Sequence, residues 1–338
     1  MASDTDEARG RVRLRTKRAA YALWIAGWVC LGLPASPSAA GYLDGEWLHL
    51  MGRLSDPNVI AARAQSAMVM DTARDRLIVF GGNPGPTQDV WVLPMVPGAN
   101  WERLVVNGTQ PGARFGHCAI YDPIGDRILV FGGYSHGVRN DLWALALSGT
   151  PRWTNVATSG APMAVQDASA VYDALQHRMV VFGGLRADGT CTNTTWALPQ
   201  RGTPTWSLVP VYGTEPPARA AAQSALDLPN NRMVVFGGWS GNFDLDDTWV
   251  LGLEQGGYWQ RITTFQQPPT RRAGAAVFDV SDNRMVVFGG VTGPDVSSDC
   301  WQLTLDEAPE WTELAPSGST PPARSEACAV YDDARDRL

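Results

Sequence analysis

The chain has 338 residues, of which 44% are hydrophobic and 18% are charged, and it is rich in glycine (35) and tryptophan (14). Its formal net charge is −7; the first 40 residues hold six of the 27 basic and three of the 34 acidic side chains, which leaves 21 basic and 31 acidic groups in residues 41–338. This acidic body repels phosphate groups, so nucleic acid and anionic membrane surfaces are excluded as expected partners.

The first 40 residues have the three parts of a secretory signal peptide. A basic stretch ends at Arg18, an apolar run of 15 residues covers 19–33, and small residues up to Ala40 offer a cleavage site. The run is shorter than the ~20 residues that a membrane span needs. Cleavage of a signal peptide over 1–40 is therefore favoured, with a retained anchor as the alternative. We expect a secreted, periplasmic or cell-surface protein with no membrane span after cleavage.

A seven-residue segment, Arg76-Leu-Ile-Val-Phe-Gly-Gly82, returns along the chain at steps of 51, 51, 54 and 52 residues. The later copies begin at Arg127, Arg178, Arg232 and Arg284, and the last two residues of the chain begin a sixth. A repeat of about 50 residues built from short apolar strands is typical of a β-propeller blade. Since such units bury their faces only against each other, residues 41–338 are expected to form one body.

One repeat shows how a blade is built. Short apolar strands are predicted at 116–121 and 127–131, an alternating strand at 141–147 and a fourth at 153–156, each followed by a turn or loop. Four such strands make one antiparallel sheet that runs from the channel to the rim. The other repeats align with this one, so we expect five complete blades at 63–104, 114–156, 166–209, 219–262 and 271–314.

Tryptophans recur at two fixed places in the repeat, and their regular spacing predicts packing between blades. The third strands carry Trp91, Trp143, Trp196, Trp249 and Trp301, and the fourth strands carry Trp101, Trp153, Trp206, Trp259 and Trp311.

Together these features resemble the kelch repeat family, especially the exported bacterial kelch propellers related to the central domain of galactose oxidase. The resemblance covers residues 45–338 and rests on the glycine doublet, the downstream Asp-x-Trp, the later Trp and a Pro-x-x-Arg lead-in. It implies an all-β, kelch-type propeller of four-stranded antiparallel blades. Because the family includes oxidases, sugar epimerases and pure interaction modules, the resemblance is specific for fold and weak for function.

The two ends of the repeat region predict how the ring closes. Residues 45–50 resemble a lone fourth strand, and 324–338 resemble the start of a further blade. In kelch rings an N-terminal strand often closes the last blade, so a closing strand is expected at 45–50. We expect a partial last blade over 324–338, in a chain truncated from a six- or seven-bladed ring.

One series of arginines precedes the inner strands, and Val165 interrupts it. Two interpretations stay open: a ring of guanidinium groups near the channel mouth that holds a carboxylate or sulfate, or bonds from each arginine to main-chain carbonyls or an acid of the adjoining blade. The series is Arg63, Arg114, Arg219, Arg271 and Arg324.

Three other recurrent features are interpreted as structural. The arginines that open the seven-residue segment follow an aspartate turn, which predicts pairing across the hairpin. No helix start or lysine follows the glycine doublets, so they are not phosphate loops, and positive φ or close backbone approach explains them. Cys118, Cys191, Cys300 and Cys328 are expected to be free buried thiols, because no pairing suits their places in the repeat.

The loops after the doublets vary between blades, and variable loops on a rigid scaffold are where binding sites usually lie. Blade four has the richest loop, in which Trp239 and Phe243 are candidates for stacking on a sugar or a partner. Asp244 and Asp246 lack the spaced oxygen ligands of a calcium site. The four histidines do not suggest a multi-histidine copper site, so no metal and no cofactor is predicted.

The sequence thus favours a propeller that binds a protein or a glycan through its loop face, as a monomer, and that is not an enzyme. The alternative is a sugar isomerase, epimerase or hydrolase with its site at the channel mouth; no catalytic residue is assigned. The candidate ligand-binding residues are Arg114, Tyr134, His136, Arg139, Arg186, Asp188, Arg219, Trp239, Phe243, Asp244 and Arg271.

Overall fold

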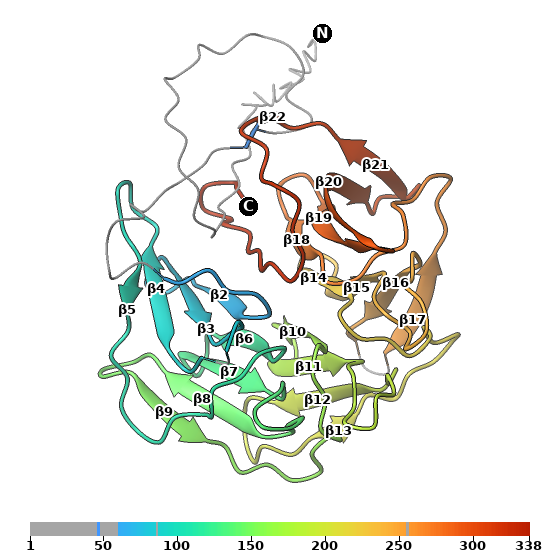
Figure 1. Ribbon diagram of the computed structural model, residues 1–338. Helices are drawn as coiled ribbons and strands as arrows, with labels where there is room; N and C mark the ends of the chain where they lie inside the picture. Colours follow the sequence, from blue (N-terminus) through green and yellow to red (C-terminus); the bar gives the residue numbers. More distant parts are fainter. Residues whose placement is uncertain (1–45, 48–59, 86, 255–256) are drawn as a thin grey trace, which may run out of the picture.

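In the computed structural model the described residues are 46–47, 60–85, 87–254 and 257–338, and the predicted signal peptide lies outside them. Five four-stranded antiparallel sheets are arranged around a channel as the blades of a β-propeller (Figure 1). In each blade the strands follow one another from the innermost to the outermost. The predicted all-β propeller with five complete blades is confirmed.

The strands of the five blades lie at equivalent positions in the repeat. They are β2 (Ala67–Asp71), β3 (Arg76–Phe80), β4 (Val90–Pro94) and β5 (Glu102–Arg103) in blade one; β6 (Cys118–Asp122), β7 (Arg127–Phe131), β8 (Leu142–Ala146) and β9 (Arg152–Asn155) in blade two; β10 (Ser169–Asp173), β11 (Arg178–Phe182), β12 (Thr195–Pro199) and β13 (Ser207–Leu208) in blade three; β14 (Gln223–Asp227), β15 (Arg232–Phe236), β16 (Thr248–Gly252) and β17 (Tyr258–Ile262) in blade four; and β18 (Ala275–Asp279), β19 (Arg284–Thr292), β20 (Asp295–Thr304) and β21 (Glu310–Leu314) in blade five.

The core lies between blades, because the second strand of each blade is buried on both faces. The phenylalanine that ends this strand packs against a tryptophan of the next blade that lies in the outer strand or directly before it, with ring centroids 4.7–4.9 Å apart. Aromatic contacts of this kind add to the free energy of burying apolar surface. The pairs are Phe80–Trp153, Phe131–Trp206, Phe182–Trp259 and Phe236–Trp311. The predicted blade-to-blade role of these outer tryptophans is confirmed.

The first glycine of each doublet lets neighbouring blades approach. At Gly81 the backbone has φ +69°, and a Cβ there would lie 2.6 Å from the carbonyl oxygen of Arg114. The next residue, Gly82, donates its N–H to that same oxygen at 2.9 Å. Only glycine permits both the conformation and the contact, as the sequence predicted.

The hairpin arginines also have the partners that were expected. In blade two the Nε of Arg127 donates to the buried carboxylate of Asp122 at 2.8 Å. The equivalent pairs are Arg76–Asp71, Arg178–Asp173, Arg232–Asp227, Arg284–Asp279 and Arg337–Asp332. They fix the turn between the two inner strands of each repeat. Cys118, Cys191, Cys300 and Cys328 form no disulfide bond within the described residues; Cys118 and Cys300 are buried as predicted, whereas Cys191 and Cys328 are only half-buried.

A sixth place in the circle, between blades five and one, is taken by residues 324–338 (Figure 1). Gly290 of blade five donates to the carbonyl of Arg324, as each doublet does to the next repeat. On the other side, Arg335 pairs with Asp75 of blade one, which repeats the Arg74–Asp126 pair between blades one and two. The segment therefore lies in the same register as the inner strands of a blade.

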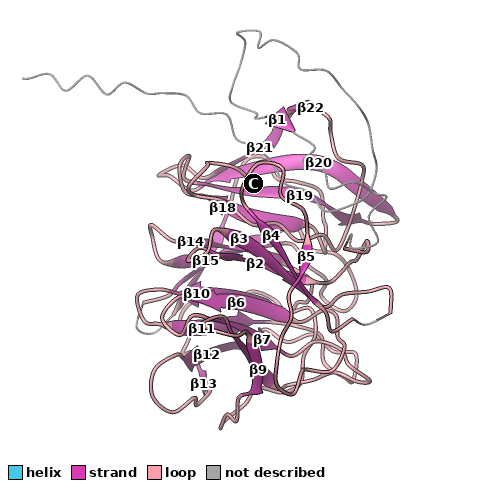
Figure 2. Cartoon of the chain, turned by 90° about the vertical axis from the view of Figure 1, so that its left-hand side faces the viewer, coloured by secondary structure: helices cyan, strands magenta, loops and turns pink. Residues whose placement is uncertain are grey.

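The strand β1 (Glu46–Trp47) pairs in parallel with β22 (Ser317–Gly318), which follows blade five (Figure 2). Elsewhere in the ring, the linker after an outer strand makes the same parallel bridge with the outer strand of the next blade, as Asn107 does with Arg152. Further bridges of this kind are Ser159–Thr205 and Tyr212–Tyr258. By this equivalence, β1 has the position of an outer strand at the sixth place. Residues 48–50 of the predicted closing strand lie outside the described residues.

Candidate binding site at the channel mouth

A closed ring of six backbone hydrogen bonds surrounds the channel on the side of the variable loops, which we call the loop face. The residue two positions after each arginine of the interrupted series, or after Val165 in blade three, has a left-handed φ of 50–61°. Its N–H donates to the carbonyl of the equivalent residue in the preceding repeat, at 2.6–3.0 Å. The ring is closed, because Gln65 in turn accepts its neighbour's N–H and donates to the sixth place. Its members are Gln65, Gly116, Asp167, Ala221, Ala273 and Glu326.

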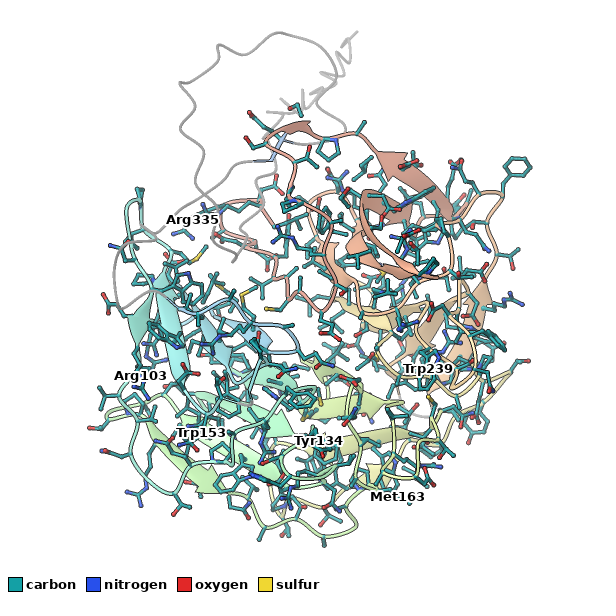
Figure 3. All side chains as sticks on the ribbon, viewed as in Figure 1. Arg103, Tyr134, Trp153, Met163, Trp239 and Arg335 are labelled. Carbon is teal, nitrogen blue, oxygen red and sulfur yellow. The ribbon has the colours of Figure 1, made fainter. Side chains whose placement is uncertain are left out.

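The variable loops stand directly around this ring. The residue that follows each glycine doublet bridges the residue just before the ring position, and these bridges are Ala64–Asn83, Phe115–Tyr134, Gln166–Leu185, Ala220–Trp239 and Arg272–Val291. Tyr134 and Trp239, both predicted from the sequence, therefore hold equivalent positions in blades two and four (Figure 3). Since the bridge fixes the backbone on both sides, their aromatic rings are presented by a rigid frame.

The two aromatic side chains differ in what supports them. Tyr134 is 37% exposed and stacks on Phe115 of its own blade, with ring centroids 5.3 Å apart. Trp239 is half-buried, and its carbonyl lies 3.3 Å from the thiol of Cys191 in the loop of blade three. Phe243, in the same loop as Trp239, is 63% exposed. The loop face thus presents three large aromatic groups from two blades.

The remaining loop candidates lie on the same loops. His136 and Arg139 are exposed in blade two, where Arg139 donates to the carbonyl of Ser135. In blade three, Arg186 is half-buried, and its Nε is buried with no hydrogen-bond partner among the described residues. Asp188 is exposed, and hydrogen bonds from Thr190 lower the pKa of its carboxyl group.

Arg114, Arg219 and Arg271, by contrast, lie below the mouth, where they are 0–1% exposed. Each guanidinium group binds an aspartate through two N–H groups and also donates to the first carbonyl of its own doublet; Arg219, for example, binds both oxygens of Asp247 at 2.7 and 2.9 Å. Arg114 pairs in the same way with Asp141, and Arg271 with Asp299. The structure therefore gives these three arginines partners within their own blades, which supports the second of the two interpretations for them.

The aspartates in these pairs are the acids of the Asp-x-Trp motif. Asp247 also accepts a hydrogen bond from the indole of Trp249 at 2.6 Å. Burial alone would raise the pKa of Asp247, but the hydrogen bonds from Arg219 and Trp249 outweigh it and hold the pKa below its usual range. Arginine, acid and tryptophan thus form one hydrogen-bonded network in each of these blades, and the arginine at its centre is fully buried.

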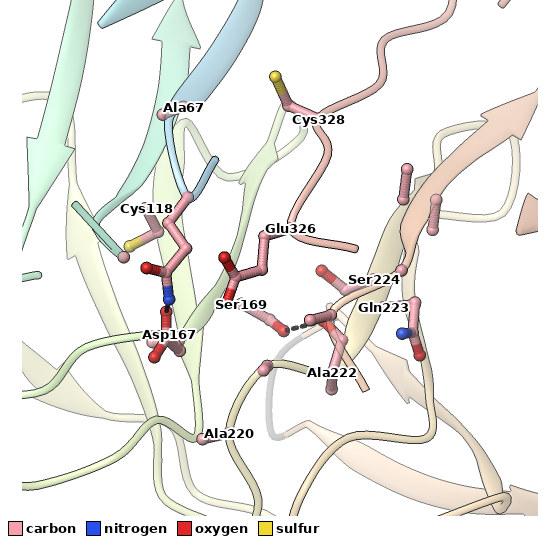
Figure 4. Close-up of a pocket in the computed structure, with 18 of the residues that line it drawn as sticks. Ala67, Cys118, Asp167, Ser169, Ala220, Ala222, Gln223, Ser224, Glu326 and Cys328 are labelled. Carbon is pink, nitrogen blue, oxygen red and sulfur yellow. Dashed lines mark hydrogen bonds between the residues drawn. The ribbon is translucent and has the colours of Figure 1, made fainter. Parts of the chain in front are cut away.

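A cavity of about 380 Å³ lies at the centre of the ring (Figure 4). Alanine and small polar residues of the inner strands form most of its wall, and Leu185, Trp239 and Arg272 reach it from the loop face. Its volume falls in the ~300–1,000 Å³ range of small-molecule pockets. Two acidic side chains line it, Asp167 of blade three and Glu326 at the sixth place.

The electrostatics of this cavity set it apart from the Arg–Asp networks. Burial, with a smaller contribution from the charge of Glu326, raises the pKa of Asp167 to about 6. Burial also raises the pKa of Glu326, and the nearby charge of Arg272 opposes that rise. Arg272 itself forms an ion pair with Asp244, another candidate from the sequence, so it does not neutralise the cavity.

Sequence reasoning missed Asp167 and Glu326. Neither belongs to a motif of the repeat, and they are 159 positions apart in the printed chain. A signal was nevertheless present: the ring position holds Gly or Ala in three of the six repeats and an acid in two of them. An alignment of the repeats at this column would have placed both acids at the channel.

Two features are absent from the described part of the chain. No group of three or more His, Cys, Asp or Glu side chains there is placed to hold a metal ion. Over the same residues, no helix combines the length and the apolar character that crossing a membrane requires.

The comparisons with known proteins point to one repeat family. The family described as the KLHDC2/KLHL20/DRC7 Kelch-repeats domain matches residues 46–167 and 124–336. Adagio-like protein 3 of rice (Oryza sativa subsp. japonica) is 28% identical over 73% of this chain and 41% of its own length. An F-box/kelch-repeat protein of Arabidopsis thaliana is 30% identical over 56% of this chain and 43% of its own length. The chain therefore spans about two fifths of the length of these relatives.

Among solved structures, the one titled "Structure of YjhT" superimposes with a TM-score of 0.64 and 14% identity, over 81% of this chain and 89% of that one. At that identity the likeness concerns the fold alone. It places this chain among the propellers.

Proposed function

The chain belongs to the kelch-repeat family, and from this premise we propose that it is a binding module whose protein partner docks on the loop face. The observation that carries the proposal is the pair of aromatic side chains, Tyr134 and Trp239, held at equivalent positions of blades two and four beside the channel mouth. Tyrosine and tryptophan are enriched among the residues that dominate binding energy. Propellers of this family typically serve as interaction modules, which supports the same assignment.

The experiment uses a random peptide display library panned on the full chain. Selected peptides are expected to bind the wild-type protein, and Trp239→Ala or Tyr134→Ala is expected to weaken binding at least tenfold, because each removes a large contact surface. Tyr212→Ala is the matched control, since Tyr212 is 63% exposed on a linker and makes its parallel bridge through the backbone. Peptides that lose affinity with Tyr212→Ala but not with the two mouth variants would contradict the loop-face assignment.

A second candidate function is sugar chemistry at the channel mouth, and the acid pair favours it. Carboxyl groups with a raised pKa are suited to general acid catalysis near neutral pH, and Asp167 has a pKa of about 6 inside a cavity. Trp239 and Phe243 are the aromatic groups on which a sugar ring would stack. Glycan-array binding with isomerase, epimerase and hydrolase assays decides this candidate: turnover lost in Asp167→Asn supports it, and no glycan binding and no turnover removes it.

The location of the protein is also part of the proposal. The tripartite pattern of residues 1–40 supports export with cleavage after Ala40. N-terminal sequencing of the protein recovered outside the cytoplasm is expected to begin at Gly41. A product that retains residues 19–33 would favour the membrane anchor instead.

A further inference from the structure

The cavity at the centre of the ring carries uncompensated negative charge. Asp167 and Glu326 stand three steps apart in a ring of six positions, so they approach the channel from opposite sides. Figure 4 shows both acidic side chains at the cavity. Two half-buried carboxylates that face one cavity repel each other, and a cation between them relieves this cost in free energy.

Within the described residues, neither carboxyl group forms an ion pair. The side-chain hydrogen bonds that Asp167 accepts there are two long ones from amides, Gln65 at 3.4 Å and Gln166 at 3.3 Å. For the Glu326 carboxylate, no side-chain hydrogen bond or ion pair is found within residues 60–85, 87–254 and 257–338. Two basic side chains among the described residues line the cavity. Burial lowers the pKa of His117 to about 3, so it carries no charge near neutral pH, and Arg272 is paired with Asp244.

The walls of the cavity suit a side chain that has an aliphatic stem and a charged end. Alanines at three consecutive positions, 220–222, and others on the strands of blade five and the sixth place form an apolar sleeve, with Leu185 and Trp239 at its outer end. Lysine and arginine bury their methylene stems along apolar surface while their charged heads find polar partners. The indole of Trp239 also provides a face on which a cation is attracted.

We propose that this cavity receives a cationic side chain, lysine or arginine, of the protein partner, with its charge between Asp167 and Glu326. The inference rests on the proposed loop-face binding and names the chemistry of the partner. An anion is excluded by the charge of the wall, and a neutral group leaves both carboxylates uncompensated.

The affinity of the cavity for a cation is expected to depend on pH. The groups that face Asp167 are the amides of Gln65 and Gln166, the carboxyl of Glu326 and the Cys191 thiol. Arg272 faces Glu326. Because the acids must be ionised to hold a cation, affinity is expected to rise severalfold between pH 5 and pH 7.5.

The first experiment uses n-butylammonium chloride as the probe on the full chain, with n-butanol and sodium butyrate as neutral and anionic matches. Amide resonances of the ring residues Gly116 and Ala221 are expected to shift saturably with the ammonium ion. Asp167→Asn and Glu326→Gln are each expected to weaken this binding at least tenfold. Glu307→Gln is the control, since it removes one exposed charge from the turn between β20 and β21. Equal binding of n-butanol or butyrate, or full affinity in the Asp167→Asn and Glu326→Gln variants, would overturn the inference.

The second experiment separates this inference from the function on which it rests. Peptides selected on the loop face are resynthesised with each lysine or arginine replaced by methionine. A tenfold loss for one such replacement, matched by a similar loss in Glu326→Gln, supports a cationic side chain in the cavity. Peptides that bind equally well without any basic residue overturn this inference and leave the loop-face function standing. Failure of every peptide to bind overturns the proposed function, and the inference about its partner with it.

Discussion

At the scale of single residues, the aspartate carboxylate occurs in two opposite environments in this propeller. The carboxylates of the Asp-x-Trp motif in blades two, four and five are buried or half-buried but surrounded by donors, and their pKa values lie below the usual range. Asp167 is flanked by two long amide contacts and a second acid, and its pKa is raised to about 6. Residues with perturbed pKa values cluster at functional sites. The cavity is therefore a better candidate for ligand chemistry than the arginine series, whose charges are paired.

The raised pKa of Asp167 predicts how the free energy of unfolding depends on pH. Its carboxyl has a pKa of about 6 in the folded state and about 3.8 when unperturbed. Above pH 6 the folded protein holds an ionised group that it disfavours. As pH falls from 6 to 4 the folded state takes up a proton that the unfolded state does not, so the cost is relieved. Two units of pKa correspond to about 3 kcal/mol at most.

Asp167→Asn is therefore expected to stabilise the protein by about 1–3 kcal/mol at pH 8, and by almost nothing at pH 4. Urea unfolding at intervals between these pH values measures the difference. The exposed carboxylate of Glu307 provides the control, and Glu307→Gln is expected to give a flat difference. A gain from Asp167→Asn that persists unchanged at pH 4 would show that charge is not its cause.

At the scale of the blade, the third repeat explains why the arginine series is interrupted. Where the other blades have arginine and aspartate, blade three has Val165, which is buried, and Thr194. The indole of Trp196 donates to the Thr194 hydroxyl at 3.2 Å, in place of a carboxylate. Both charged members are thus absent together. A lone buried charge of either sign would be costly, so the pair is exchangeable only as a unit.

This predicts a strong coupling in blade four. Arg219→Val leaves Asp247 without its cation, and Asp247→Thr leaves a fully buried guanidinium group unpaired, so each is expected to destabilise by about 3–5 kcal/mol. The double variant recreates the arrangement of blade three and is expected to cost less than either single change. A double-mutant cycle by urea unfolding measures the coupling.

A surface ion pair provides the comparison for this cycle. Arg74 and Asp126, both about 30% exposed, join blades one and two. Their coupling is expected to stay below about 1 kcal/mol, because exposed pairs gain little. Simple additivity of Arg219→Val and Asp247→Thr would refute the account of blade three.

At the scale of the whole molecule, the features of the fold that could be predicted from the sequence are those that recur in every repeat. The blades, the hairpin pairs and the interblade tryptophans recur five or more times, so local pattern was enough to predict them. Tyr134 and Trp239 were found because they break the pattern in loops. Asp167 and Glu326 line one cavity only because ring closure brings blade three and the sixth place around the same channel. An electrostatic interaction across a channel leaves no trace in local sequence spacing.

Ring closure is the property that unites the molecule. The ring of six N–H groups is complete only when residues 324–338 occupy the sixth place. Tyr331 holds that segment: it packs against the core of blade five, and its hydroxyl lies 2.7 Å from Asp279 of that blade. Its removal should therefore loosen one place in the circle and leave the Phe–Trp contacts of blades one to five in place.

Tyr331→Ala is accordingly expected to change hydrogen exchange at particular amides. The N–H of Gln65 donates to Glu326, and that of Glu326 donates to Ala273, so both should lose protection when the segment is released. The amides of Gly116, Asp167, Ala221 and Ala273 have acceptors in blades one to four and should keep theirs. Tyr258→Ala, a change of the same size at a side chain that is 58% exposed on the rim, should leave all six unchanged. An equal loss at all six would mean that the propeller opens as one cooperative unit, because release of one place would then unfold every blade.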